Sequence, residues 1–369
     1  MKLILFFSRG ISLLTWQNSG LLYRELAIYK RMLSYLESIS FITYGKKSEE
    51  SFVKDIDGLD VLYNKWRLPT DFFSLLSSLI YRNRICNADV IKTNQINGWW
   101  AGGLAKLLYC RPLVVRCGYL LSLDQERKGY GRLRRYLVSI LEKYAFKYAD
   151  ASIVTTPQIK EEIIRRYGIA SDKIHIIPNP VDIDLFRPMP EIERVRGRLC
   201  FVGRLTPEKN IELLLEALSG IKNASILIIG DGELKSYLKS RSVRMGINAH
   251  FLGNIPNNEL PELLNTCQAF VLQSKWEGMP KVLIEAMACG MPVVGTNVSG
   301  IRDLIDHEQT GILCEPEIES LRDAIRKVLN NSQLCKDIGR QARDFVANNF
   351  SLKECVSKEL DLLTTLINR

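Results

Sequence analysis

The sequence predicts an α/β protein with two doubly wound domains, and two observations carry this prediction. Short apolar runs alternate with amphipathic helical stretches along the whole chain, which is the pattern of βαβ units on a mostly parallel sheet. A proline-bearing stretch, residues 178–190, interrupts this alternation, and the same pattern begins again after it. At 369 residues the chain is long enough for two domains that each bury a core.

The first half alternates predicted strands with predicted helices. Each strand is a short apolar run, and each helix has apolar residues at helical spacing. Strands are expected at Leu3–Phe7, Ile39–Tyr44, Val61–Tyr63, Val90–Thr93, Leu113–Cys117, Ser152–Thr155 and Ile174–Ile177. Helices are expected at residues 21–36, 71–85, 98–109, 131–148 and 158–167.

The second half repeats this pattern after a predicted linker. We interpret residues 183–197 as the linker between a first domain, residues 1–182, and a second, residues 198–350. A last amphipathic helix is expected over Ser351–Leu366. Strands are expected at Leu199–Gly203, Ser225–Ile229, His250–Leu252, Phe270–Leu272, Val293–Gly295 and Ile312–Leu313.

The composition is that of a soluble globular protein, with 46% hydrophobic and 25% charged residues. No apolar run approaches the roughly 20 residues that span a bilayer. Lys2–Phe7 is too short for the core of a signal peptide, so a cytoplasmic chain is expected. The nine cysteines are scattered and form no C-x-x-C pair, which is typical of reduced thiols and not of a disulfide or zinc framework.

The net charge of +9 is concentrated in the first half of the chain. Residues 1–190 hold 28 Lys and Arg against 18 Asp and Glu, whereas residues 191–369 hold 22 against 23. The densest part, Arg127–Leu141, mixes basic and aromatic residues at the start of an amphipathic helix, which suits an anionic membrane surface. A solvated helix face is the alternative, and nothing in the chain resembles a nucleic-acid-binding motif.

The most informative segment is Ser274–Gly290, in which Glu277 and Glu285 flank a Gly278-Met279-Pro280-Lys281 turn. An apolar strand precedes the turn and a helix follows it. Gly278 permits an unusual backbone angle, and Pro280 suits the first helical position. A strand, a tight loop and a helix N-terminus form a phosphate site. Carboxylates are good acceptors for sugar hydroxyls.

Three further loops follow predicted strands in the same half. Gly203 and Arg204 end one strand, and Lys209 follows in the same loop, so two cations suited to phosphate stand together. A glycine-rich turn follows the next strand and contains Gly230 and Gly232, and the third loop contains Asn254 and Ile255. In doubly wound sheets ligands bind beyond these strand ends.

These segments resemble the E-x7-E and G-R-L-x-x-x-K-N signatures of retaining glycosyltransferases of family 4, which have the GT-B fold. The resemblance is dense over residues 198–316 and weak over the first 150. It implies two Rossmann-like domains facing a central cleft, the first binding the acceptor and completed by the C-terminal helix, residues 351–369. It also implies a nucleotide-sugar donor, UDP- or GDP-linked, bound by the second domain.

The resemblance also implies roles for individual residues. Glu285 should accept hydrogen bonds from the ribose, and Glu277 should lie over the transferred sugar. Arg204 and Lys209 should neutralise the diphosphate, which makes them, with Glu277, the expected catalytic residues. The remaining implied contacts to the donor come from Gly203, Gly230, Gly232, Asn254, Ile255 and the backbone of Gly278, Met279, Pro280 and Lys281.

The family often adds a histidine from the first domain near the donor sugar. The positions where it would be sought hold Lys92-Thr93-Asn94-Gln95 and Arg116-Cys117-Gly118-Tyr119, so Asn94 and Arg116 are the candidate polar contacts there. His175, His250 and His307 have no metal-ligand spacing partner. No Asp-x-Asp is present, so a metal-independent reaction is expected.

The sequence therefore predicts a retaining, hexosyltransferase-like glycosyltransferase, peripheral on the inner face of the cytoplasmic membrane. Its expected acceptor is a saccharide or lipid-linked saccharide used in surface polysaccharide or lipopolysaccharide biosynthesis. A nucleotide-sugar epimerase and a non-catalytic partner subunit, both on the same fold, are the alternatives. A nicotinamide-dependent oxidoreductase is disfavoured because Phe7–Ser12 does not supply G-x-G-x-x-G after the first strand.

Overall fold

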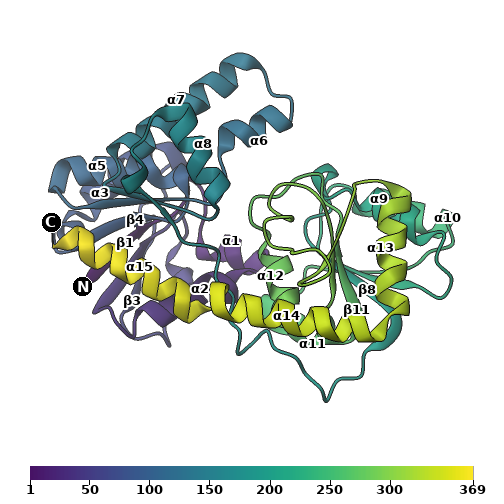
Figure 1. The fold of residues 1–369 in the computed structure, drawn as a ribbon. Helices are drawn as coiled ribbons and strands as arrows, with labels where there is room; N and C mark the ends of the chain where they lie inside the picture. Colours follow the sequence, from purple (N-terminus) through teal and green to yellow (C-terminus); the bar gives the residue numbers. More distant parts are fainter. Residues whose placement is uncertain (369) are drawn as a thin grey trace. The chain divides into compact units, whose positions relative to one another are not determined.

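The computed structural model describes residues 1–368 and divides into two compact units (Figure 1). The first unit contains Met1–Asn18, Glu25–Pro178 and the chain from Cys355 onward. The second contains Asn179–Glu354 together with a short segment from the first half, Ser19–Arg24. Each unit has one parallel sheet, which confirms the predicted α/β class with two doubly wound sheets.

The sheet of the first unit has the strand order β3-β2-β1-β4-β5-β6-β7. Every neighbouring pair is parallel, with Leu3 of β1 opposite Ile39 of β2 on one side and Val90 of β4 on the other. These strands are β1 (Lys2–Phe6), β2 (Ser38–Ile42), β3 (Leu59–Leu62), β4 (Val90–Thr93), β5 (Leu113–Cys117), β6 (Ala151–Val154) and β7 (Ile174–Ile176).

Helices cover both faces of this sheet (Figure 1). The face with α3, α5, α7 and α8 packs on an apolar core that includes Ile91 and Val115, whereas Lys92 and Arg116 point to the face with α2 and α15, because side chains alternate along a strand. The helices are α1 (Leu13–Asn18), α2 (Leu22–Met32), α3 (Thr70–Ile80), α4 (Arg82–Cys86), α5 (Trp99–Tyr109), α6 (Leu121–Arg127), α7 (Arg132–Tyr148), α8 (Pro157–Tyr167) and α15 (Leu352–Ile367).

The sheet of the second unit has the order β10-β9-β8-β11-β12-β13, again all parallel. Helix α12 packs with α14 and helix α9 packs with α13, on opposite faces (Figure 1). The strands are β8 (Val195–Val202), β9 (Ser225–Ile229), β10 (Asn248–Gly253), β11 (Cys267–Leu272), β12 (Val293–Thr296) and β13 (Ile312–Cys314). The helices are α9 (Ile211–Leu218), α10 (Lys235–Arg244), α11 (Leu260–Asn265), α12 (Lys281–Ala288), α13 (Ile318–Asn330) and α14 (Ser332–Phe350).

Three details differ from the sequence prediction. The helix expected over residues 71–85 divides at Tyr81, whose φ of −106° and ψ of 24° end α3 before α4 begins. Strand β8 begins at Val195, inside the range interpreted as linker, because Val195 donates its N–H to the Thr266 carbonyl at 2.9 Å. Helices α1 and α6 were not expected from the sequence.

No helix within residues 1–368 combines the length and the hydropathy needed to cross a membrane. All nine cysteines are free thiols. Burial raises the pKa of Cys289 and Cys314 to about 12, so these thiols stay protonated and pack as small apolar side chains.

Candidate active site

The second sheet changes its winding direction between β8 and β11. From β8 the chain proceeds outward through β9 to β10, and from β11 it proceeds outward in the other direction through β12 to β13. The loops that follow β8 and β11 therefore diverge at one edge of the sheet, and this is where doubly wound folds bind ligands. Both of the charged sequence segments lie in these two loops.

The loop after β8 holds the two predicted cations in different surroundings. A short 3₁₀ turn, Pro207–Lys209, and a left-handed Asn210 with φ of 51° reverse the chain before α9 begins. Arg204 is largely exposed, and its guanidinium lies 3.4 Å from Glu208. The Lys209 side chain is mostly buried, which fixes its ammonium group against the neighbouring loop.

The loop after β11 brings Glu277 to Lys209. The Glu277 Oε1 atom lies 2.5 Å from the Lys209 Nζ atom and accepts a hydrogen bond of 2.6 Å from the Ser274 hydroxyl. Backbone contacts hold the two loops together, since the Lys275 N–H donates to the Glu208 carbonyl at 2.8 Å. The Gln273 amide also donates to the Lys209 carbonyl at 2.7 Å. The loops thus present one carboxylate and one ammonium group as a fixed pair.

Helix α12 begins one residue later than expected. Its first helical residue is Lys281, so Pro280 is the capping residue, and no side chain caps the helix. Gly278 permits an unusual backbone angle, but its φ is not positive. The positive φ belongs to Gly300, at 83°, where a Cβ atom would lie 2.3 Å from the Gly278 carbonyl oxygen. Met279 is buried, and its carbonyl accepts a bond of 3.0 Å from the Asn179 amide.

Glu285 lies on the second turn of α12 and is only 2% exposed. Its Oε1 atom accepts a hydrogen bond of 3.0 Å from the Asn257 amide and lies 3.5 Å from the Arg24 guanidinium. Its Oε2 atom is buried and has no hydrogen-bond partner. A buried carboxylate oxygen without a partner carries an energetic cost, so this atom is suited to accept a hydroxyl from a ligand.

Gly230 and Gly232 have a structural explanation. A Cβ atom on Gly230 would lie 2.0 Å from the Gly203 carbonyl oxygen, and one on Gly232 would lie 2.5 Å from the Leu205 carbonyl oxygen. The glycine-rich turn therefore packs backbone to backbone against the loop that carries Arg204. Asn254, exposed, and Ile255, half-buried, follow β10 at the same edge of the sheet.

Three contact residues of this site were not found from the sequence. Ser274 and Asn257 are ordinary polar residues in loops, and their roles depend on which carboxylate they meet. Arg24 comes from the Ser19–Arg24 segment, which joins the second unit through a bond of 3.0 Å from the Asn257 N–H to the Gly20 carbonyl. An arginine so distant in sequence gives no local signal of this contact.

Of the two candidates in the first unit, Arg116 has different surroundings from those expected. Arg116 is buried, and its guanidinium lies 4.0 Å from Glu359 on α15, beside the Lys92–Glu359 ion pair. It therefore belongs to a cluster under the C-terminal helix. Asn94 donates its N–H to the Phe6 carbonyl at 2.8 Å. Among residues 1–368, no three His, Cys, Asp or Glu side chains lie close enough to hold a metal ion.

Comparison with known proteins defines the class. The Glycosyl transferases group 1 family matches residues 184–345, and the family described as Glycosyltransferase Family 4 matches residues 42–185. The UDP-Gal:alpha-D-GlcNAc-diphosphoundecaprenol alpha-1,3-galactosyltransferase of Escherichia coli is 27% identical over 297 residues, which are 76% of each chain. The 2-deoxystreptamine glucosyltransferase of Streptomyces kanamyceticus is 24% identical over 320 residues, which are 80% of this chain and 81% of that one.

A solved structure, Anabaena HepE in complex with UDP and glucose, is similar with a TM-score of 0.80 at 20% identity, covering 98% of this chain and 99% of that one. The fold and the two family matches define a GT-B glycosyltransferase that uses a nucleotide-sugar donor. The chain belongs to glycosyltransferase family 4, a retaining family.

Proposed function

We propose that this enzyme moves a sugar from a UDP- or GDP-linked donor to a saccharide or lipid-linked saccharide acceptor during the synthesis of a surface polysaccharide or lipopolysaccharide. The single observation that carries the donor site is the buried Glu285 carboxylate with its unpartnered Oε2 atom. Two ribose hydroxyls present paired donors that match a carboxylate.

We assign the diphosphate of the donor to the neighbouring cations. Lys209 and Arg204 stand beyond β8, and the uncapped N-terminus of α12 follows the loop after β11. Their positive charge stabilises the diphosphate as it gains negative charge on leaving, and preorganised groups of this kind are the main catalytic device for such a reaction. Glu277, paired with Lys209, is then placed to contact the transferred sugar.

The proposed reaction requires neither a metal ion nor a base supplied by the enzyme. The bond from the anomeric carbon to the phosphate oxygen breaks, and a bond from the acceptor oxygen to the same carbon forms on the same face. The acceptor proton passes to the leaving phosphate oxygen. The residues of the chain bind and orient both partners and stabilise the charge that develops on the phosphate.

The acceptor proposal is supported by the relative from Escherichia coli, whose name specifies a sugar diphosphate attached to undecaprenol. The basic character of residues 1–190 supports the same idea, because an acceptor held in an anionic bilayer is reached by a positively charged surface. We therefore propose that the first unit, with the C-terminal helix, binds the acceptor and makes peripheral contact with the membrane.

Thermal denaturation with a panel of nucleotide sugars tests the donor site. One nucleotide sugar should raise the midpoint of wild type, whereas Glu285→Gln and Arg204→Ala should show a smaller rise. Arg340→Ala is the matched control for Arg204→Ala, because Arg340 is a similarly exposed arginine on α14, paired with an acidic residue in the same way. No response to any nucleotide sugar, or equal responses from wild type and Glu285→Gln, would overturn the assignment.

The acceptor is tested with the donor found in this way. The product formed with a lipid pyrophosphoryl saccharide is analysed by NMR for the configuration at the new linkage. Retention of the donor's anomeric configuration is expected. An inverted product contradicts the proposed mechanism, and turnover that needs no saccharide acceptor supports the epimerase alternative.

A further inference from the structure

Helix α3 buries Phe73 and three serines, and it carries large apolar residues on its exposed side. Its serines Ser74, Ser77 and Ser78 are buried, and the Ser78 hydroxyl donates to the Ala101 carbonyl at 3.1 Å while Ser74 bonds to the Tyr44 hydroxyl at 2.5 Å. A helix on a water-exposed surface normally turns its apolar side inward. Here the opposite side of α3 carries exposed large apolar residues at positions i, i+3, i+4 and i+7, namely Phe72, Leu75, Leu76 and Leu79.

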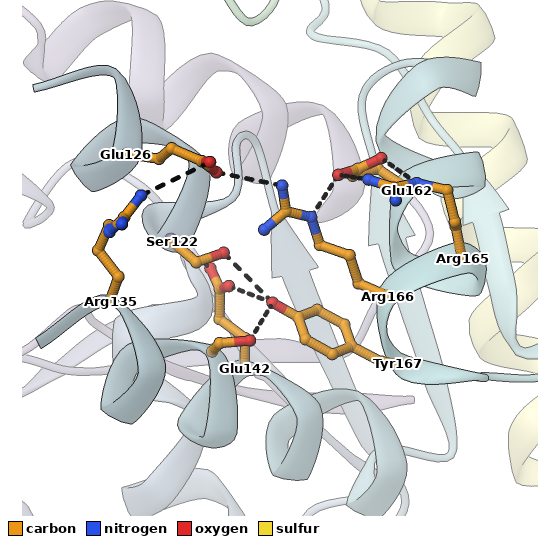
Figure 2. Close-up of polar contacts among 9 residues, drawn as sticks. Ser122, Glu126, Arg135, Glu142, Glu162, Arg165, Arg166 and Tyr167 are labelled. Atoms are coloured by element: carbon orange, nitrogen blue, oxygen red, sulfur yellow. Dashed lines mark hydrogen bonds and ion pairs between the residues drawn. The ribbon is translucent and has the colours of Figure 1, made fainter. Parts of the chain in front are cut away.

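Helix α7 buries Ala145 and Phe146 in the core, and it also carries large apolar residues on its exposed side. Its one acidic residue, Glu142, is buried and accepts hydrogen bonds from the Leu121 N–H at 2.6 Å and from the Tyr167 hydroxyl at 2.7 Å. Figure 2 shows the contact between Tyr167 of α8 and Glu142 of α7, and also Glu126 of α6 between Arg135 and Arg166. The outward side carries Leu133, Tyr136, Leu137, Leu141, Tyr144 and Tyr148, with Leu133 73% exposed.

Helix α5 lies between α3 and α7 and joins their outward sides (Figure 1). The Tyr109 hydroxyl of α5 donates to the Ser78 carbonyl of α3 at 2.9 Å, and the Lys106 ammonium donates to the Tyr148 carbonyl of α7 at 2.8 Å. Leu107, which is 76% exposed, and Leu108 lie next to Lys106 on α5. The exposed apolar residues of the three helices thus form one surface, which we call the outer face.

The exposed charges along α7 are all positive, and on α5 Lys106 is paired with Asp150. Arg132, Arg134, Lys143 and Lys147 are exposed along α7, where the only acid points inward. The Arg134 guanidinium stacks 4.1 Å above the centre of the Tyr130 ring. On α3 the only charged residue is Asp71, which is paired with Arg9. Apolar side chains with tyrosines at their border and flanking cations match the interface of an anionic bilayer.

We propose that the outer face is a membrane-docking surface that inserts its leucines and phenylalanine into an anionic phospholipid leaflet. An exposed apolar surface built from three helices marks a site of interaction. The positive border selects an anionic lipid surface, since each cation near such a surface adds attraction. This proposal rests on the proposed function, because it specifies the membrane contact through which a lipid-linked acceptor is reached. From the sequence alone, that contact was expected only in Arg127–Leu141.

Sedimentation with vesicles tests this surface on the full-length protein. Vesicles of phosphatidylcholine alone are compared with vesicles of equal parts phosphatidylcholine and phosphatidylglycerol. Wild type should bind the mixed vesicles more than tenfold more tightly. Leu137→Glu with Leu141→Glu, and separately Arg132→Gln with Lys143→Gln, should each lose more than tenfold in binding to the mixed vesicles.

Val243→Glu is the matched control, because Val243 is an exposed apolar residue on α10 of the other unit. It should bind vesicles like wild type, and circular dichroism should show unchanged folding in every variant. The proposal fails if wild type does not bind the mixed vesicles, or if the α7 variants bind them like wild type. It also fails if wild type is a dimer that Leu137→Glu dissociates without loss of vesicle binding, since the face is then an interface between copies.

The donor thermal shift separates this proposal from the proposed function. Failure to bind vesicles with an intact donor shift overturns the docking surface alone. Normal vesicle binding with no response to any nucleotide sugar overturns the donor site alone.

Discussion

At the scale of single residues, the Lys209–Glu277 pair decides how the donor is received. Lys209 cannot neutralise a diphosphate fully while Glu277 holds its ammonium group at 2.5 Å. Glu277→Gln keeps an acceptor for the Ser274 hydroxyl and removes the competing charge. We expect this variant to bind the free nucleoside diphosphate as tightly as wild type or more tightly, as measured by isothermal titration calorimetry.

The same substitution should lower turnover if Glu277 contacts the transferred sugar. A hydrogen bond to a charged group is worth about 1.5–3 kcal/mol, so kcat should fall by about ten- to a hundredfold. Lys209→Ala is the comparison, and it should weaken diphosphate binding by a similar factor. Weaker diphosphate binding by Glu277→Gln, with unchanged kcat, would show that the carboxylate only positions Lys209.

The sequence could indicate the charged residues of this site but not their contacts. Glu277, Glu285, Arg204 and Lys209 were selected because their segments follow predicted parallel strands and resemble the E-x7-E and G-R-L-x-x-x-K-N signatures of family 4. Which oxygen of Glu285 is occupied depends on Asn257 and Arg24, and their approach is a matter of tertiary structure. The sequence drew attention to Gly278, whereas the positive φ lies at Gly300, where the backbone closely approaches the Gly278 loop.

At the scale of elements, Tyr167 and Glu142 fix the position of α6 relative to α7 and α8 (Figure 2). Tyr167→Phe removes a hydroxyl that donates to the buried carboxylate. We expect it to lower the free energy of unfolding by about 1–3 kcal/mol, the cost of leaving a buried acceptor short of a partner. Urea unfolding in a Trp276→Phe background checks this, because the remaining tryptophans all lie in the first unit.

The pH dependence of the stability difference between wild type and Tyr167→Phe provides the control for this prediction. Burial, followed by the charge of Glu142, raises the pKa of Tyr167 to about 12, above the value of about 10 for an exposed tyrosine. Between these values the folded chain holds a proton that the unfolded chain has lost, so the contribution of Tyr167 falls as pH rises. The difference between wild type and Tyr167→Phe should therefore shrink from pH 10 to pH 12. A constant difference contradicts the assignment.

The elements themselves were largely predictable because their apolar periodicity is strong. Strands such as Val90–Thr93 and Leu113–Cys117 have the predicted bounds, since a buried parallel strand is one continuous apolar run. Periodicity identified α3 and α7 as amphipathic, but it does not state which side faces the core. The inward side of α3 is set by bonds from Ser74 and Ser78 to other elements, which a sequence pattern does not contain.

At the scale of the whole molecule, a buried ion pair holds the C-terminal helix on the first unit. Lys92 of β4 and Glu359 of α15 are 1% and 0% exposed and are paired, with Arg116 beside them. Burial lowers the pKa of the Lys92 ammonium, and the Glu359 carboxylate opposes that shift. This contact joins the central strand β4 to the C-terminal helix in one unit, so its loss should affect the whole first unit.

Glu359→Ala should lower the free energy of unfolding of the first unit by about 3–5 kcal/mol, because it leaves the buried Lys92 ammonium group without the Glu359 carboxylate. Lys92→Met combined with Glu359→Leu should recover much of this loss, since apolar residues of similar volume often replace a buried pair at little cost. Urea unfolding in the Trp276→Phe background measures both variants.

In Glu359→Ala the pKa of Lys92 falls further below its unfolded value, so the unfolded chain binds the extra proton and stability rises with pH. The loss of unfolding free energy in Glu359→Ala relative to wild type should thus become smaller as pH rises toward 10. A loss that is small at neutral pH, or that does not change with pH, would show that α15 is held by its apolar contacts alone.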